Sequence, residues 1–103
     1  MTLLHINSLE QLNALIQNES KVIIDFYAQW CGPCKMIAPF FEELATKNPS
    51  IKFVKVDVDE TEDICRVYKI RNMPTFKLIK NGEVVSQFTG ASREQLQQMV
   101  ASA

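Results

Sequence analysis

Residues 22–35, VIIDFYAQWCGPCK, decide the fold of this chain. The run from Val22 to Ala28 is apolar on both faces, which predicts a central strand with helices on each side. The residues from Lys35 to Lys47 predict a helix, and its first turn extends back over the two thiols. Cys31 therefore falls near the N-cap, and Cys34 falls on the first turn.

This placement of the two thiols predicts their chemistry. The first N–H groups of a helix have no partner and carry positive partial charge. A sulfur at this position is stabilised as thiolate, which is the nucleophile in disulfide exchange. Pro33 gives up an N–H that had no partner, and Gly32 leaves room for an incoming sulfur. Cys31 and Cys34 can thus close a small disulfide ring without unwinding the helix.

The length, charge and hydropathy of the chain limit the classes of function that it can have. A chain of 103 residues predicts a single domain, 1–103, with one real core. The net charge of −1 and the lack of a basic stripe give no support for nucleic-acid binding. No apolar run approaches the ~20 residues that cross a bilayer, so we expect no membrane partner. Residues 1–6 lack the pattern of a signal peptide. A cytoplasmic location is expected; an organelle stays open if a transit peptide has been removed.

The three cysteines do not form a disulfide scaffold. A structural zinc site needs four ligands, and the chain adds only Cys65 and His5 to the close pair. No metal site is therefore expected. Cys65 is interpreted as a small buried hydrophobe on a short helix, with regulatory oxidation or intermolecular pairing as the alternative.

Hydrophobic periodicity and turn signals predict the order β-α-β-α-β-α-β-β-α. Ser8 and Ser92 each begin a capping-box pattern before a helix. Asn81-Gly82 is a strong signal for a two-residue hairpin. The remaining expected elements are a first strand at Leu4 and Ile6, a strand over 51–58, a short helix ending near Tyr68, and hairpin strands over 75–80 and 84–89.

The chain resembles the thioredoxin family over essentially its whole length. The matching residues are Asp25-Phe26, Trp30 to Lys35, Pro39, Lys55 with Asp57 and Asp59, Met73-Pro74-Thr75, Asn81-Gly82 and Gly90. The resemblance implies an α/β fold whose mixed five-stranded sheet has the order first-third-second-fourth-fifth, flanked by four helices. Two departures are Tyr27, where many bacterial members carry Trp, and Cys65, where many relatives carry Ala.

The implied activity is that of a thiol-disulfide oxidoreductase, a protein disulfide reductase and electron carrier. Cys31 is expected to attack a substrate disulfide and Cys34 to resolve the mixed disulfide. Asp25, a carboxylate inside an apolar strand, is interpreted as the acid–base group for Cys34. The alternative is a structural Asp that caps a neighbouring loop. The resemblance makes Lys55 the cation that opposes the rise in the pKa of Asp25.

The resemblance also implies a flat apolar docking surface and a cis Met73–Pro74 bond facing the dithiol. A cis bond would present the Met73 backbone to an extended substrate chain. For Trp30, simple core packing is the competing interpretation. The residues of the expected docking surface are Trp30, Gly32, Pro33, Met73, Pro74, Gly90 and Ala91.

The expected partners are oxidised proteins with exposed disulfides and a separate flavin-containing thioredoxin reductase that draws electrons from NADPH. No bound cofactor is expected, since the chain carries no Gly-rich phosphate turn. A monomer is expected. Three other functions stay open: a disulfide isomerase or oxidase module, a glutaredoxin-like user of glutathione, and a binding module whose thiols are incidental.

Overall fold

The structure, a computed structural model, describes residues 3–103. Five strands and four helices alternate along these residues. Their bounds are β1 Leu3–Ile6, α1 Leu9–Asn18, β2 Lys21–Tyr27, α2 Gly32–Lys47, β3 Lys52–Asp57, α3 Glu62–Tyr68, β4 Thr75–Lys80, β5 Glu83–Thr89 and α4 Arg93–Ser102. No helix in this part of the chain is long and apolar enough to cross a membrane.

The five strands form one mixed sheet in the order β1-β3-β2-β4-β5. β3 runs parallel to both β1 and β2, whereas β4 runs antiparallel to β2 and to β5. The predicted fold class and strand order are therefore confirmed. The register places Asp25 of β2 opposite Lys55 of β3, so two residues that lie far apart in the sequence become neighbours.

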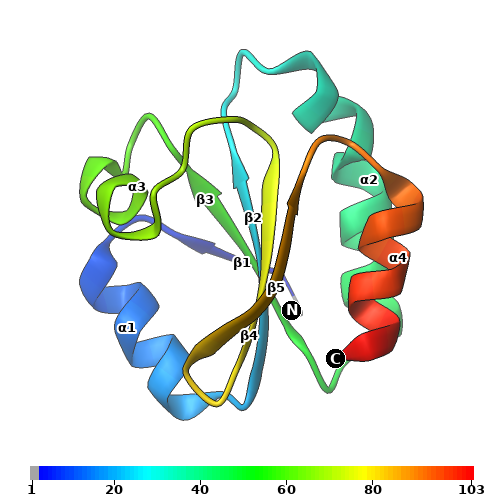
Figure 1. The fold of residues 1–103 in the computed structure, drawn as a ribbon, viewed down its shortest axis with the longest axis horizontal. Helices are drawn as coiled ribbons and strands as arrows, with labels where there is room; N and C mark the ends of the chain where they lie inside the picture. The colour runs from blue at the N-terminus through cyan, green and yellow to red at the C-terminus, as the bar shows by residue number, and fades with distance from the viewer. Residues whose placement is uncertain (1–2) are drawn as a thin grey trace.

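The helices cover the sheet in two pairs, with α1 and α3 on one face and α2 and α4 on the other (Figure 1). Alternation along β2 divides its side chains between the two layers. Ile23 packs with Phe41 of α2 and Leu96 of α4. Ile24 packs with Leu12 of α1 and the rest of the opposite core. β2 is consequently buried on both faces, as its uninterrupted apolar run predicts.

Local chemistry sets the ends of most helices. The Ser8 and Ser92 side chains each accept a hydrogen bond at the helix N-terminus, from the N–H groups of Gln11 and Gln95. Asn81 and Gly82 both have positive φ, 52° and 86°, which the tight two-residue turn requires. The predicted caps and the hairpin are confirmed, although β5 begins one residue before the expected strand.

Helix α3 begins differently from the other helices. Its N-cap residue, Thr61, makes no side-chain cap bond. The Thr61 hydroxyl donates instead to the backbone carbonyl of Asp57 at 2.7 Å. Glu62 and Asp63 occupy the first turn, where negative charge is favoured by the helix dipole. The loop after β3 is thus tied to the start of α3 by a buried threonine.

Candidate active site

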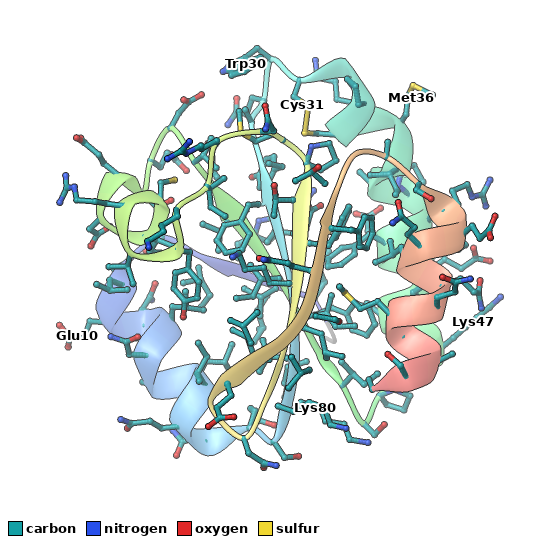
Figure 2. The ribbon with its side chains drawn as sticks, in the orientation of Figure 1. Glu10, Trp30, Cys31, Met36, Lys47 and Lys80 are labelled. Atoms are coloured by element: carbon teal, nitrogen blue, oxygen red, sulfur yellow. A yellow bond between two sulfur atoms is a disulfide. The ribbon has the colours of Figure 1, made fainter. Side chains whose placement is uncertain are left out.

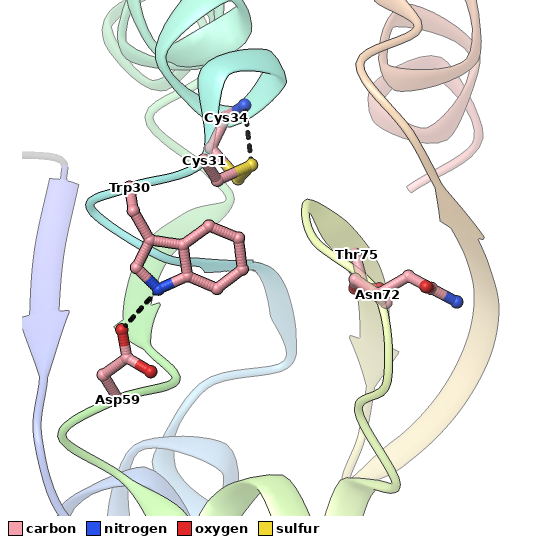
Figure 3. The surroundings of a disulfide bond; sticks show 6 residues. All are labelled: Trp30, Cys31, Cys34, Asp59, Asn72 and Thr75. Atoms are coloured by element: carbon pink, nitrogen blue, oxygen red, sulfur yellow. Dashed lines mark hydrogen bonds between the residues drawn. A yellow bond between two sulfur atoms is a disulfide. The ribbon is translucent and has the colours of Figure 1, made fainter.

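The site is built around a disulfide between Cys31 and Cys34 at the strand-to-helix junction after β2 (Figure 3). The two Cα atoms are 5.3 Å apart. Both cysteines are almost fully buried, with 5% and 3% of their surface exposed. Ala28 and the half-buried Met73 pack against them. The pair is therefore held in an apolar setting at one end of the sheet.

The helix geometry places the two sulfurs in different positions. Cys31 is the N-cap of α2, and its Sγ accepts a hydrogen bond from the backbone N–H of Cys34 at 3.2 Å. An acceptor at this position is stabilised further when it carries negative charge. Burial hardly separates the two cysteines. The helix begins at Gly32 rather than at Lys35 because Pro33 is tolerated in its first turn.

Asp25 lies inside the sheet on the face that α2 covers. It lies two residues after Ile23 on β2 and so on the same face of the sheet, where the Ile23 side chain packs against that helix. Asp25 is 0% exposed, and neither of its carboxylate oxygens has a hydrogen-bond partner among residues 3–103. It therefore caps no neighbouring loop. Burial raises the pKa of Asp25 to about 7, and the positive charge of Lys55 opposes that rise.

Lys55 lines a cleft that reaches Cys34 of the disulfide. Its ammonium nitrogen lies over the ring of Tyr27, 4.4 Å from the centroid, within the range of a cation–π contact. The cleft has a volume of about 340 Å³, and Cys34 and Gln29 also line it. Cys34 thus borders an open cleft that Lys55 also lines.

Trp30 is not a core residue, because 68% of its surface is exposed. Its indole N–H donates to the carboxylate of Asp59 at 2.9 Å (Figure 3). Asp59 is held in turn, since its own N–H donates to the Asp57 carboxylate at 2.9 Å. This role of Asp59 has no signal in the sequence, because the two partners lie 29 residues apart. The bond fixes a large apolar side chain beside the disulfide.

Replacement of Asp59 by Ala is expected to free the indole while leaving the fold intact. Trp30 is exposed, so water replaces the lost acceptor and the free energy of unfolding falls by less than about 1 kcal/mol. Because Trp30 is the only tryptophan, its fluorescence reports the change directly through intensity and anisotropy. A loss of stability well above that figure would mean that Asp59 has a larger structural role.

The Met73–Pro74 peptide bond is cis, as the resemblance implies. Pro74 is buried, and its carbonyl accepts from the N–H of Gly90 at 2.9 Å. Gly90 has a φ of 102°, a conformation that glycine adopts without strain. Ala91 is only half-buried and packs against the core under α2 and α4. The segments around Pro74 and Gly90 are thus tied together next to the disulfide.

Exposed apolar side chains gather at this end of the molecule (Figure 2). Gly32 and Pro33 are exposed at the start of α2. Met36, on the next turn, is 79% exposed and was missing from the expected docking surface. The sequence held a signal for it, since the helical spacing of Cys34, Ile37 and Phe41 defines the core face and leaves Met36 on the opposite side of α2. Met36 and Trp30 flank the disulfide on two sides.

Cys65 lies on α3, apart from the disulfide cluster. Its side chain is half-buried, and its thiol donates a weak hydrogen bond to the Val58 carbonyl at 3.6 Å. Burial raises the pKa of the Cys65 thiol, so the protonated, unreactive form is favoured at neutral pH. This agrees with its interpretation as a packing residue. Val67, two residues further along α3, is largely exposed and so does not pack in the core.

No three His, Cys, Asp or Glu side chains within residues 3–103 form a group that could hold a metal ion. The chemistry available to the site lies in its thiols and in the buried carboxylate next to Lys55.

Comparison with known proteins agrees with this geometry. The profile of the thioredoxin family matches residues 4–102. Thioredoxin-1 of Caenorhabditis elegans is 51% identical over 82 residues, which cover 80% of this chain and 71% of that protein. Thioredoxin 1 of Plasmodium falciparum is 42% identical over 95 residues, covering 92% of this chain and 91% of that one.

Comparison with solved structures also finds thioredoxins. A mutant thioredoxin of Entamoeba histolytica superposes with a TM-score of 0.94 at 55% identity, covering 98% of this chain and 99% of that one. The oxidised mitochondrial thioredoxin 3 of Saccharomyces cerevisiae also reaches 0.94, at 38% identity, covering 98% and 95%. With a Cys31–Cys34 disulfide at the start of α2, the chain belongs to the thioredoxin family and is a thiol-disulfide oxidoreductase.

Proposed function

We propose that the chain reduces disulfides in other proteins, with Cys31 as the attacking thiolate and Cys34 as the resolving thiol. One observation carries this assignment. The Sγ of Cys31 accepts the N–H of Cys34 at the N-terminus of α2. That position lowers the free energy of a thiolate at Cys31 more than at Cys34.

The first step joins the two proteins. In the reduced form the Cys31 thiolate attacks one sulfur of the substrate disulfide. The substrate S–S bond breaks, a Cys31–substrate disulfide forms, and the other substrate sulfur leaves as a thiolate that takes up a proton. Exchange of this kind needs a thiolate at each attack.

The second step releases the product. Cys34 loses its proton and attacks the Cys31 sulfur, so the Cys31–Cys34 bond re-forms and the second substrate sulfur leaves as a thiolate. Two electrons have then passed from the dithiol to the substrate. Asp25 is the proposed acceptor of the Cys34 proton, through water in the cleft that Cys34 lines. A pKa of about 7 suits a base that works near neutral pH, and Lys55 stabilises its charged form.

The proposed docking surface is the end of the molecule around the disulfide. Its members are Trp30, Gly32, Pro33, Met73, Pro74, Gly90 and Ala91, to which the structure adds Met36 as a candidate. We propose that a separate NADPH-dependent flavin reductase returns electrons to the Cys31–Cys34 pair, and that the chain acts as a monomeric single domain in the cytoplasm without a bound cofactor.

The reduction potential of the Cys31–Cys34 pair tests the direction of electron flow. We expect it to lie well below the glutathione poise, because only then is the reduced form a strong donor to most disulfides. The protein is equilibrated in thiol–disulfide buffers and the fraction reduced is followed by Trp30 fluorescence. A potential near or above the glutathione poise would instead assign the chain to isomerase or oxidase chemistry.

A further inference from the structure

A second hollow, which we call the basic pocket, lies between the loop after α3 and the strands β4 and β5. Its volume is about 360 Å³. Three cations line it, and no acidic residue does. Two threonines and two amide side chains complete the polar lining. The polar residues that matter here are Lys69, Arg71, Asn72, Thr75, Lys77 and Gln87.

Lys77 is the unusual member of this pocket. It lies in the middle of β4, and only 9% of its surface is exposed. Its ammonium donates to the side-chain carbonyl of Gln87 at 2.6 Å and lies 5.9 Å from the centroid of the Tyr68 ring. Both partners are neutral. Burial lowers the pKa of Lys77, the direction expected for a cation removed from water without a counter-ion.

No carboxylate neutralises the pocket. Neither Lys69, Arg71 nor Lys77 forms an ion pair within residues 3–103, where the two ion pairs present are Lys47–Glu43 and Arg66–Glu62. A buried cation without an opposite charge is unfavourable. An anion that entered the pocket would supply that charge together with charge-assisted hydrogen bonds.

The pocket adjoins the proposed docking surface. Asn72 and Thr75 line it and also lie in the surroundings of the disulfide (Figure 3). Met73 and Pro74 stand between them in the chain, and Met73 packs against the two cysteines. On the neighbouring strand, Thr89 lines the pocket and Gly90 bonds to Pro74. A substrate chain lying along Met73 therefore passes the mouth of the pocket.

We propose that the basic pocket binds an acidic side chain of the substrate protein, located a few residues from the cysteine under attack, and so selects among disulfides. The inference rests on the proposed reductase function. A Glu or Asp carboxylate fits because three cations line the pocket and no acid does, and Arg71 offers a planar pair of donors that matches a carboxylate. The exchange chemistry itself is unchanged.

Synthetic peptides linked by one disulfide test the proposal. Each carries a single Glu at one of five positions on either side of the cysteine, and matched peptides carry Gln or Lys there. The second-order rate constant of reduction by the reduced protein is measured at low and high salt. At one or two neighbouring positions we expect the Glu peptide to react about fivefold to tenfold faster than the Gln peptide, as one partly exposed charge-assisted contact would give.

Three variants locate the effect. Lys77→Met, and the double variant Lys69→Gln with Arg71→Gln, are each expected to reduce the preference for Glu towards unity while leaving the rate with the Gln peptide unchanged. The matched control is Lys47→Gln with Lys80→Gln, which removes two charges far from Cys31 (Figure 2). That variant should keep the preference. High salt should weaken it in every protein that shows it.

The outcomes separate the two proposals. Reduction of all peptides at equal rates would overturn the acidic-substrate proposal and leave the reductase function standing. Failure to reduce even the Gln peptides would count against the reductase function itself. A pocket that takes inorganic phosphate, seen as phosphate-specific shifts of the Lys77 resonances without any Glu preference, would be a small-anion site, and the acidic-substrate proposal would be wrong.

Discussion

Replacement of Cys34 by Ser is expected to leave the protein bonded to its substrate. Cys31 still attacks, because its N-cap position does not depend on the side chain of Cys34: the donor to its sulfur is the backbone N–H. The serine hydroxyl cannot displace the substrate sulfur from Cys31. Each protein molecule therefore reacts once at most, and the mixed disulfide accumulates instead of turning over.

Replacement of Cys31 by Ser is expected to have the opposite result. The remaining thiol of Cys34 lacks the N-cap position, so it is a poor nucleophile toward a second protein. We expect the rate of substrate reduction to fall to that of the uncatalysed exchange, and no mixed disulfide to accumulate.

Mass spectrometry of acid-quenched mixtures measures both results, with one disulfide peptide as substrate. Cys65→Ser is the matched control, because Cys65 lies apart from the disulfide cluster and its thiol is protonated at neutral pH. It should neither trap substrate nor slow reduction. Accumulation of the mixed disulfide in Cys31→Ser rather than in Cys34→Ser would reverse the assignment of the two thiols.

The sequence predicts this centre well because the decisive contacts are local. Cys31 and Cys34 lie three residues apart on one helical turn, and the N-cap, Pro33 and the apolar strand before them all lie within residues 22–35. Local propensities and patterns act at such separations. The hairpin at Asn81-Gly82 is predictable for the same reason, since the turn itself requires positive φ.

The contacts that escaped prediction cross long separations. The bond from Trp30 to Asp59 and the contact of Lys55 with the Tyr27 ring depend on how loops meet after the sheet has formed. Lys77 escaped for a related reason. The sequence alone favours a solvent-exposed ammonium for a lysine in an apolar strand. In the structure, the Lys77 side chain lies against the loop after α3 and is buried.

Asp25 is predictable in part, because one of its features is local and the other depends on a residue far away in the sequence. Its burial follows from the apolar run around it, whereas its pairing with Lys55 follows from the register of β2 and β3, which the sequence pattern leaves open. The resemblance to the family identified Lys55 as the cation that acts on Asp25. The register of β2 and β3 gives the physical reason, because it places the two residues opposite each other. The lack of any hydrogen-bond partner to the carboxylate within residues 3–103 had no signal in the sequence.

Replacement of Asp25 by Ala is expected to stabilise the fold and to slow turnover. The carboxylate is fully buried and unbonded, so the folded state gains free energy when it is removed. The gain depends on pH. The pKa of Asp25 is about 7 in the folded protein, against an ordinary value of 3.8. Between these values the folded protein keeps a proton that the unfolded chain has lost.

The sign of the effect follows from that difference. Stability falls with rising pH wherever the folded state binds more protons. The wild-type protein should therefore lose stability relative to Asp25→Ala from about pH 4 to pH 7, and the difference should level off above pH 7. The total change is about 4 kcal/mol, since each pKa unit corresponds to about 1.4 kcal/mol. Urea unfolding of both oxidised proteins at each pH measures it. A difference that is the same at every pH would show that burial does not perturb Asp25.

Turnover supplies the second readout. Without the base, Cys34 must lose its proton to water, and the resolving step should slow by about 10²-fold near neutral pH. The defect should shrink as the pH rises, because hydroxide can then take the proton of Cys34 in place of Asp25. Asp25→Asn, which keeps the size and loses the charge, should show the same kinetic defect. A turnover rate equal to wild type in both variants would remove Asp25 from the mechanism, whatever its effect on stability.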